Sequence, residues 1–267
     1  MKENGGILIS EREKRYHMLA EERFSAIVKI VEAKRTVTVQ ELTELLETSE
    51  STIRRDLTEL HKRGKIIKVH GGATAVEMEY RTKDASVPER QNLNTDEKML
   101  IAEKAVEFIR KDDFVYIDAG TSTSFLVDCI KEKNAVYVTN AFTHARKLVQ
   151  KGCRVFLLGG ELKESTEAII GVDAVESLNK YNFTKGFFGA NGVHRERGFT
   201  TPDVNEASVK RKAFQKCKER YVLADSSKIN KISSVTFSDF NDAVVITSTV
   251  KETSFKKCAN VVEADKR

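Results

Sequence analysis

Residues 49–72 read SESTIRRDLTELHKRGKIIKVHGG, and this stretch decides the fold of the N-terminal part of the chain. The side chain of Ser49 can accept a hydrogen bond from the backbone amides of the next turn, which predicts that a helix begins here. Ile53, Leu57 and Leu60 follow at helical spacing and predict one buried face. The opposite face of the predicted helix is polar and basic.

The second half of the stretch predicts the end of this helix and a wing. Gly64 can adopt the left-handed conformation that ends helices, and the alternation over residues 65–72 predicts a small β-hairpin. Between Thr52 and Lys68 six basic side chains stand against two acidic ones, although the net charge of the whole chain is only +5. A local excess of positive charge is typical of a surface that binds nucleic acid, and a solvated charged helix is the alternative.

Two further helices are predicted before residue 49. The first ends near Lys34, and the second follows the strand-prone segment 36–38. Their apolar residues at helical spacing are Phe24, Ile27, Val28 and Val31, then Val39, Leu42, Leu45 and Leu46. Three helices followed by a hairpin make a winged helix-turn-helix, which we assign to residues 18–75.

The third helix of this fold fits the major groove of double-stranded DNA, and here its first turn carries hydroxyl side chains and two arginines. The arginines can reach guanine edges or phosphates, while basic side chains of the wing can hold the flanking backbone. The predicted DNA-binding residues are Ser51, Thr52, Arg54, Arg55, Lys65, Lys68 and His70.

Composition limits the remaining possibilities. The 267 residues are 40% hydrophobic and 32% charged, which suits two globular domains. The chain has no apolar run of about 18 residues and no export signal, so we expect a cytoplasmic protein with no membrane partner. Its four cysteines and five histidines are scattered without metal-ligand spacing, and we expect no metal site, no disulfide framework and no cofactor.

Two segments lack an apolar period. Residues 1–17 are interpreted as a tag or an extension without fixed structure, and Met18 is the alternative start. Residues 76–94 are mostly polar, contain Pro88 and are predicted to form an exposed linker. A cap at Asn94 or Thr95 then predicts the helix that opens the second domain, residues 95–267.

The second domain is predicted to have an α/β fold. Short apolar runs alternate with helical stretches, which is typical of a mainly parallel sheet covered by helices. The candidate strands are 114–118, 136–139, 154–158, 186–189, 221–224 and 243–247. In such sheets ligands bind beyond the carboxyl ends of the strands.

The residues that follow the candidate strands are polar. The loop Asp118-Ala119-Gly120-Thr121-Ser122-Thr123 combines a glycine with three hydroxyls at an expected helix start, where phosphate binds well. A capped turn without a ligand is the alternative for this loop alone. The other strand ends are expected on the same rim and add groups for sugar hydroxyls and phosphate; they are residues 139–140, 159–161, 189–192 and 225–228.

Over nearly everything after Met18, the sequence resembles the DeoR family of bacterial regulators. The motif Ser49-Glu50-Ser51-Thr52-Ile53-Arg54-Arg55-Asp56-Leu57, followed by His70-Gly71-Gly72-Ala73, carries the resemblance. Within this motif we interpret Asp56 as a residue that holds the helix through a neighbouring basic side chain, because a carboxylate facing phosphate would be repelled.

The resemblance implies a C-terminal effector domain related in fold to ribose-5-phosphate isomerase and coenzyme A transferases. Residues 189–194 and 198–203 look most like repressors of fructose-utilisation operons, for which fructose 1-phosphate is the typical inducer, whereas relatives respond to tagatose 6-phosphate or glycerol 3-phosphate. The rim and the family pattern together predict effector binding by Asp118, Gly120, Thr121, Ser122, Thr123, Asn140, Gly160, Asn191, Glu206, Lys210, Asp225 and Lys228. The expected function is a homo-oligomeric repressor, dimer or tetramer, that binds repeated half-sites of a DNA operator.

A sugar-phosphate isomerase fused to a DNA-binding module is the main alternative. Isomerisation needs a carboxylate base beside the sugar, but residues 189–192 read Gly-Ala-Asn-Gly where the isomerase fold places acids. Only Glu206 and Asp225 remain as candidate bases, so we expect no enzyme activity. A nucleotide-binding module is disfavoured because no Gly-x-Gly-x-x-Gly motif follows a strand and no phosphate-loop lysine motif occurs.

Overall fold

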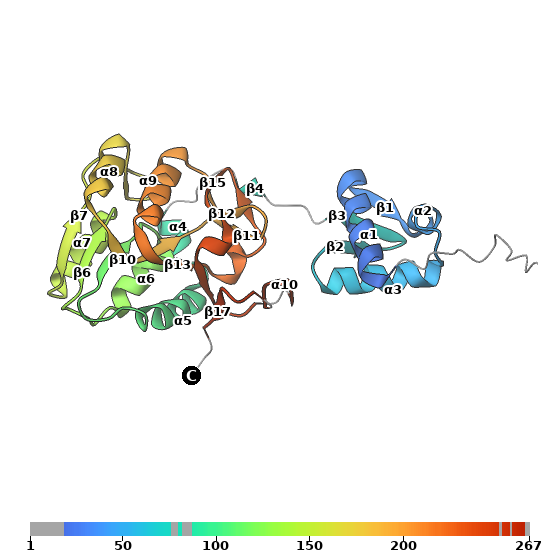
Figure 1. Ribbon diagram of the computed structural model, residues 1–267, viewed down its shortest axis with the longest axis horizontal. Coiled ribbons are helices and arrows are strands. Elements are labelled where there is room, and N and C mark those ends of the chain that lie inside the picture. Colours follow the sequence, from blue (N-terminus) through green and yellow to red (C-terminus); the bar gives the residue numbers. More distant parts are fainter. Residues whose placement is uncertain (1–18, 76–79, 82–86, 251–252, 257, 265–267) are drawn as a thin grey trace, which may run out of the picture. The chain divides into compact units, whose positions relative to one another are not determined.

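The computed structural model describes residues 19–75, 80–81, 87–250, 253–256 and 258–264. The chain divides into an N-terminal unit, 1–77, and a C-terminal unit, 78–267 (Figure 1). The expected extension, residues 1–17, lies outside the described residues, as do positions 76–79 and 82–86 of the expected linker.

The N-terminal unit has three helices and a three-stranded antiparallel sheet of order β1-β3-β2. Its elements are α1 (Ala20–Lys34), β1 (Thr36–Thr38), α2 (Val39–Leu45), α3 (Glu50–Lys62), β2 (Ile66–Val69) and β3 (Gly72–Ala75). Ile27, Leu42, Ile53 and Leu57 from the three helices pack into one fully buried core. Gly64 has a φ of 67° directly after α3, as its predicted role requires. The winged helix-turn-helix predicted for this part of the chain is confirmed.

The C-terminal unit is built on a seven-stranded, fully parallel sheet of order β17-β16-β13-β10-β5-β6-β7. Its strands are β5 (Phe114–Ile117), β6 (Val136–Thr139), β7 (Arg154–Leu157), β10 (Phe183–Gly189), β13 (Cys217–Leu223), β16 (Val244–Thr247) and β17 (Val261–Glu263). All six candidate strands are present. The short edge strand β17 is an addition that the sequence pattern did not indicate.

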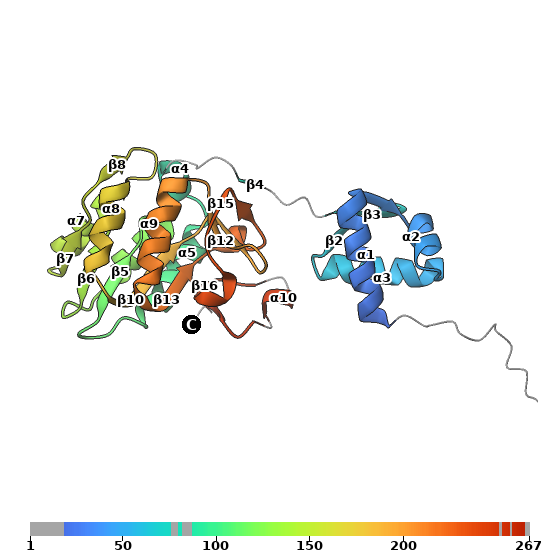
Figure 2. The ribbon, with the colours of Figure 1, turned by 45° about the horizontal axis from the view of Figure 1, so that its top comes forward.

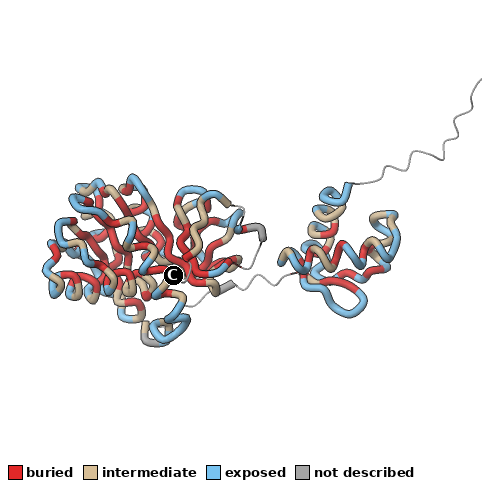
Figure 3. The backbone as a smooth tube through the Cα atoms, turned by 90° about the horizontal axis from the view of Figure 1, so that it is seen from below, coloured by how far each residue is buried: buried red, intermediate tan, exposed pale blue. Residues whose placement is uncertain are grey.

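Helices cover both faces of this sheet, so its central strands are buried on both sides, whereas the edge strand β7 is mostly exposed (Figures 1 and 2). Three of them cover one face and contribute to one core cluster: α5 (Thr95–Val106), α6 (Thr121–Cys129) and α7 (Phe142–Gln150). Two others contribute to the cluster on the opposite face: α8 (Val172–Ser177) and α9 (Val204–Gln215). Figure 3 shows the buried residues concentrated along the strands between these layers.

Smaller elements surround this framework. They are β8 (Glu161–Lys163) paired with β9 (Ala168–Ile170), the sheet of β11 (Gly192–His194), β12 (Gly198–Thr201) and β15 (Val235–Ser238), the short helices η1 (Leu178–Lys180), η2 (Ser226–Lys228), η3 (Phe240–Asp242) and α10 (Thr253–Lys256), and β4 (Tyr80–Arg81) paired with β14 (Ile232–Ser233). None of the described helices has the length and apolar composition that a membrane span requires.

The expected linker, residues 76–94, is partly structured. It contains β4 and the short helix α4 (Val87–Gln91), and both belong to the C-terminal unit. The backbone amide of Val87 donates a hydrogen bond to the carbonyl of Ser165, 3.1 Å away, so a remote loop fixes the start of α4. The sequence pattern predicted a linker here because the residues that hold this segment in place are distant in the sequence.

The order in which the chain adds strands to the sheet reverses between β5 and β10. From β5 the chain adds β6 and β7 toward one edge of the sheet, and from β10 it adds β13, β16 and β17 toward the other. Where the connections after two neighbouring parallel strands run to opposite sides of the sheet, a crevice remains beyond the carboxyl ends of those strands. The loops after β5 and β10 lie at that crevice.

Candidate functional site

Helix α3 presents hydroxyls and arginines at its first turns. The Ser49 hydroxyl accepts a hydrogen bond from the backbone amide of Thr52 at 3.3 Å and lies 3.0 Å from the Ser51 hydroxyl. Ser51, Arg54 and Arg55 are exposed, and Thr52 is half-buried. The predicted N-cap is therefore confirmed, and it orders the turn that would approach a DNA groove.

Asp56 is on the opposite side of the same helix and is buried. Its two carboxylate oxygens accept hydrogen bonds from the Arg23 guanidinium of α1, from Nε at 2.5 Å and from Nη2 at 3.1 Å. This bond with Asp56 raises the pKa of Arg23 above its usual value. The interpretation of Asp56 as a residue that holds α3 in place is confirmed, and the basic partner is Arg23.

Three arginines of this region have different surroundings. Arg54 donates to the Glu50 carboxylate one turn earlier at 2.6 Å, in an exposed pair. Arg63 donates to Glu59 at 2.8 Å and to Glu21 at 2.9 Å, so it joins α3 to α1. Within the described part of the chain, Arg55 has no carboxylate partner.

The wing carries the remaining predicted DNA-binding residues. Lys68 on β2 donates from Nζ to the Thr58 hydroxyl at 2.7 Å, which attaches the wing to α3. Lys65 and His70 are exposed, and His70 occupies the two-residue turn between β2 and β3. All seven predicted DNA-binding residues therefore lie on α3, on the hairpin that follows it, or, for Lys65, in the turn between them.

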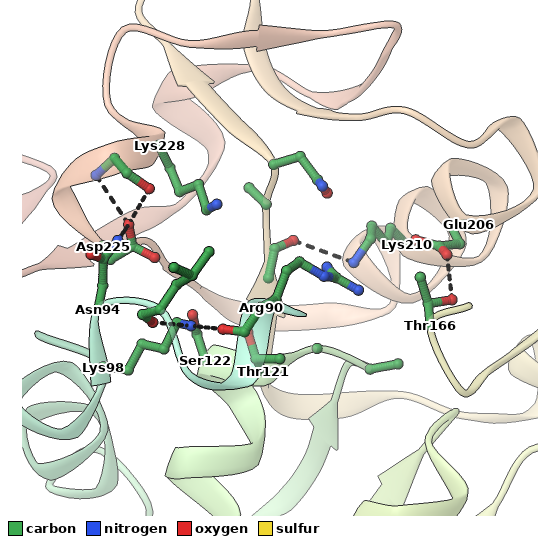
Figure 4. Close-up of a pocket in the computed structure, with 17 residues that line it drawn as sticks. Arg90, Asn94, Lys98, Thr121, Ser122, Thr166, Glu206, Lys210, Asp225 and Lys228 are labelled. Atoms are coloured by element: carbon green, nitrogen blue, oxygen red, sulfur yellow. Dashed lines mark hydrogen bonds between the residues drawn. The ribbon is translucent and has the colours of Figure 1, made fainter. Parts of the chain in front are cut away.

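A cavity of about 180 Å³ lies at the crevice between β5 and β10. Eight of the twelve predicted effector residues line it, and they come from four places in the chain: Gly120, Thr121 and Ser122 after β5, Asn191 after β10, Glu206 and Lys210 on α9, and Asp225 and Lys228 at η2. Figure 4 shows the six of them that it labels around one space: Thr121, Ser122, Glu206, Lys210, Asp225 and Lys228. Drug-sized ligands use pockets of roughly 300–1,000 Å³, so this cavity suits a smaller molecule.

Asp118 is not among the lining residues. It is 1% exposed, and its Oδ2 accepts hydrogen bonds from the Gly189 amide at 3.1 Å and from the Lys210 ammonium. Burial raises its pKa even though the charge of Lys210 lowers it. Asp118 therefore joins the β5 and β10 loops and orients Lys210 from below the cavity.

Thr123, Asn140 and Gly160 are also outside the cavity, and the first two bond to the backbone of lining residues. The Thr123 hydroxyl donates to the Gly120 carbonyl at 2.9 Å, and the Asn140 Oδ1 accepts from the Ala119 amide at 2.8 Å. Gly160 has a φ of 141°, and a Cβ there would come within 2.6 Å of a backbone carbonyl. The sequence pattern predicted that these polar or small residues lie near strand ends, but it did not predict how deeply they are buried.

Four lining residues, Ala119, Gly189, Ala190 and Ser227, lie in the rim segments that the sequence predicted but were not named as effector contacts. Five others lie outside those segments: Arg90, Leu93, Asn94, Lys98 and Thr166. No sequence pattern indicated that Arg90 belongs to the site, because its segment was predicted to be an exposed linker. A sequence pattern could have indicated Lys98, because it lies three and four residues before Ile101 and Ala102 and so shares the buried face of α5. Its ammonium donates to the carbonyls of Arg90 at 2.5 Å and Leu93 at 2.6 Å.

The charges around the cavity favour an anion. Four basic side chains line it, Arg90, Lys98, Lys210 and Lys228, against the two carboxylates of Glu206 and Asp225. The N-terminus of α6 adds backbone amides and the hydroxyls of Thr121 and Ser122. A phosphate group can bind such a set of residues through charge and several hydrogen bonds at once.

Both carboxylates are held by hydrogen-bond donors. Glu206 accepts from the Thr166 hydroxyl at 2.6 Å and from Lys163 Nζ at 2.9 Å. Burial raises the pKa of Glu206, but the charge of Lys210 and these bonds outweigh burial and leave the pKa below its usual value. Asp225 accepts from the Asn94 amide at 3.0 Å and from the Ser227 hydroxyl at 2.5 Å. Both groups are placed to accept hydrogen bonds from sugar hydroxyls.

Comparisons with known protein families match both units. The DeoR-like helix-turn-helix domain matches residues 23–79, and the DeoR C-terminal sensor domain matches residues 93–249. The uncharacterized HTH-type transcriptional regulator FruR of Bacillus subtilis (strain 168) is 43% identical over 239 residues, which cover 89% of this chain and 94% of that protein. The lactose phosphotransferase system repressor of Streptococcus mutans serotype c (strain ATCC 700610 / UA159) is 36% identical over 80% of this chain and 86% of its own.

Among solved structures, a ribose 5-phosphate isomerase A from Methanocaldococcus jannaschii aligns with a TM-score of 0.39 and 16% identity over 51% of this chain and 55% of that chain. The alignment thus spans about half of the isomerase. The two family matches together cover both units, and the two relatives, at 43% and 36% identity, span 89% and 80% of this chain. The chain therefore belongs to the DeoR family of transcriptional regulators, with a DNA-binding helix-turn-helix domain followed by a sensor domain.

Proposed function

We propose that this protein represses a sugar-utilisation operon and releases its DNA operator when a phosphorylated sugar binds the cavity of the sensor domain. The observation that carries the proposal is the cavity at the β5–β10 crevice, where a helix N-terminus and four basic side chains meet two fixed carboxylates. The cations and amides would bind the phosphate, and the carboxylates would bind sugar hydroxyls. The names of the relatives, FruR and lactose phosphotransferase system repressors, support a carbohydrate signal.

Fructose 1-phosphate is our first candidate for the effector, because the relative at 43% identity is named FruR. Its phosphate would lie against Gly120, Thr121 and Ser122 at the start of α6, within reach of Lys228. Asn191, Glu206, Lys210 and Asp225 would contact the hydroxyls. Asp118, Thr123, Asn140 and Gly160 would support these contacts from below the cavity.

On the DNA side, we propose that α3 enters the major groove. Thr52, Ser51, Arg54 and Arg55 would reach base edges or phosphates, and Lys65, Lys68 and His70 of the wing would contact the flanking backbone. Two or more copies of the chain would bind repeated half-sites as a homo-oligomer, in the cytoplasm where a bacterial chromosome lies.

The sensor domain is proposed to bind its sugar phosphate without converting it. A general base works best when its pKa lies near the working pH, and the pKa of Glu206 is lowered instead. Incubation of the protein with fructose 1-phosphate, fructose 6-phosphate and ribose 5-phosphate should leave each compound unchanged by NMR, and steady turnover would contradict this part of the proposal.

A thermal-shift panel tests effector binding. Ligands that bind only the folded state raise its melting temperature, so the panel compares fructose 1-phosphate, fructose 6-phosphate, tagatose 6-phosphate, glycerol 3-phosphate, unphosphorylated fructose and inorganic phosphate. We expect one sugar phosphate to stabilise the sensor domain more than fructose or phosphate alone. Lys228→Ala should weaken that shift, whereas Lys218→Ala, an exposed lysine at the amino end of β13, should not. A panel without any stabilising sugar phosphate would contradict the proposed function.

A further inference from the structure

One basic residue of the cavity comes from the segment that connects the two domains. Arg90 lies on α4, between the DNA-binding domain and the first helix of the sensor core, α5. In Figure 4 the side chains of Arg90 and Lys228 extend into the same space from different elements, with Thr121 and Ser122 below them in the view. An anion in the cavity would therefore meet a side chain of the connecting segment.

The attachments of this segment are also part of the cavity wall or adjoin it. The Val87 amide bonds to the carbonyl of Ser165, the neighbour of the lining residue Thr166. Lys98, itself a lining residue, holds the carbonyls of Arg90 and Leu93. The Asn94 amide bonds to the carboxylate of Asp225 at 3.0 Å.

The earlier part of the segment is attached next to the same site. Strand β4 pairs with β14, and Ile232 of β14 pairs with Tyr80 only four residues after the lining residue Lys228. Described residues 80–81 and 87–94 are thus bonded at five points to elements that form the cavity or follow it directly. A ligand that moves or stiffens these elements changes the energy of the connecting segment.

Lys98 is bonded to the connecting segment and also interacts electrostatically with the charged residues of the cavity. It is 3% exposed, and burial lowers its pKa, helped by the positive charges of Lys228 and Arg90 and opposed by Asp225. A bound anion would reduce the mutual repulsion of these three cations. Several like charges therefore lie close together at the cavity, and an anionic ligand would stabilise this arrangement, including the position of Arg90 in the wall.

We propose that Arg90 binds the anionic group of the effector and couples effector binding to DNA release through α4 and the connecting segment. This inference rests on the proposed function, because it assigns a role within the same effector site. Residues such as Ser122, on α6 in the sensor core, would bind the effector without this coupling role.

The test measures a coupling ratio with the full chain. The dissociation constant of the best-binding sugar phosphate from the panel is measured with and without a saturating DNA duplex that the parent protein has selected from a random library. The ratio of the two constants is the coupling between the sites, and thermodynamic linkage requires the effector to weaken DNA binding by the same factor. Parent, Arg90→Gln, Arg90→Lys and Ser122→Ala are compared.

We expect Arg90→Gln to raise the effector dissociation constant by at least about tenfold, since a charge-assisted bond to phosphate is lost, and to bring the coupling ratio close to 1. Ser122→Ala should weaken binding but keep the ratio of the parent. Arg90→Lys should retain part of both properties, and it provides the test if the glutamine variant does not fold.

Three results would overturn the inference in different ways. Unchanged effector binding by Arg90→Gln would show that Arg90 does not touch the ligand. Weaker binding with the ratio of the parent would make Arg90 a ligand without a coupling role. If the parent itself binds no sugar phosphate, the proposed function and this inference both fail, whereas the first two results leave the proposed function intact.

Discussion

At the scale of single residues, the two domains use charged side chains in opposite ways. In the DNA-binding domain, Arg55 is exposed without a carboxylate partner within the described residues, whereas Arg63 is bound to two glutamates. In the sensor domain, by contrast, most charged groups of the cavity are fixed by hydrogen bonds to other protein groups. The first arrangement leaves charge available for phosphates, and the second orients donors and acceptors in advance.

Substituting Arg55 tests the assignment of α3 as the recognition helix. Arg55→Ala should lower affinity for the selected duplex by about 1–3 kcal/mol if the side chain reads a base, or reduce the salt slope by about 1 if it binds phosphate. Fluorescence anisotropy at several salt concentrations measures both. Arg63→Ala is the matched control, because its guanidinium is occupied by Glu21 and Glu59, and DNA affinity equal to that of the parent is expected. Unchanged affinity and salt slope in Arg55→Ala would show that the helix is assigned wrongly.

The ion pair of Asp56 and Arg23 should matter for stability. Both side chains are largely buried, with 7% and 14% of their surface exposed, so removal of one partner leaves a charge with little solvent. Asp56→Ala should lower the free energy of unfolding of the DNA-binding domain by about 3 kcal/mol. Urea denaturation followed by circular dichroism measures this, with the exposed pair variant Glu50→Ala expected to cost less than about 1 kcal/mol. Equal small effects of both substitutions would contradict the structural role of Asp56.

At the scale of elements, helix α7 supports the loop that starts α6. His144 of α7 is 2% exposed, and its imidazole lies near the backbone of Gly120, the residue that precedes α6. Burial, together with the charge of Lys147, lowers the pKa of His144 to about 4, although the nearby Gly120 backbone and the charge of Asp128 oppose this. The loop proposed to bind phosphate is thus backed by a neutral imidazole.

This histidine predicts a pH dependence of stability. Between its unfolded pKa of 6.5 and its folded pKa of about 4, the unfolded chain binds a proton that the folded chain does not, so stability falls as the pH is lowered. The loss between pH 7 and pH 5 should be about 2 kcal/mol for this group. Urea unfolding of the parent and of His144→Gln at both pH values isolates it, because the variant lacks the titrating group. The same pH slope in both proteins would show that His144 does not titrate in this way.

The elements also show how far sequence patterns reach. Apolar patterns located the helices of the DNA-binding domain and six of the seven parallel strands, because all of these segments except the exposed edge strand β7 bury one face or both. The strand order could not be derived in this way, since the reversal between β5 and β10 depends on pairing between distant segments. For the same reason α4 was missed, as its position depends on bonds to Ser165 and Lys98.

The predicted cavity residues show the same division. Residues that follow strands, such as Thr121, Ser122 and Lys228, were identified because parallel strands bring their carboxyl ends to one rim. Depth was not predictable: Asp118 and Asn140 also follow strands, yet they are buried below the cavity. Arg90 could not be found at all without the fold, because it reaches the rim from a segment that precedes the sheet.

At the scale of the whole molecule, the chain joins a DNA-binding domain to a sensor domain, as its family membership states. Coupling between two such sites requires that the effector bind one arrangement of the protein more tightly than another. Described residues 80–81 and 87–94, which precede the sensor core, are bonded to the cavity wall, and our proposal is that this segment carries that difference. A change of tenfold in DNA affinity requires only about 1.4 kcal/mol of differential effector binding.

The most direct test of the central claim is DNA binding in the presence of sugar phosphates. The full chain is first used to select duplexes from a random library, and binding of the best duplex is then titrated with fructose 1-phosphate and the other members of the panel. We expect a selected sequence with repeated half-sites, and we expect one sugar phosphate, but not unphosphorylated fructose, to weaken its binding at least about tenfold. If a specific duplex is selected and no sugar phosphate changes its affinity, the proposal that the sensor domain controls DNA binding through a phosphorylated sugar is wrong.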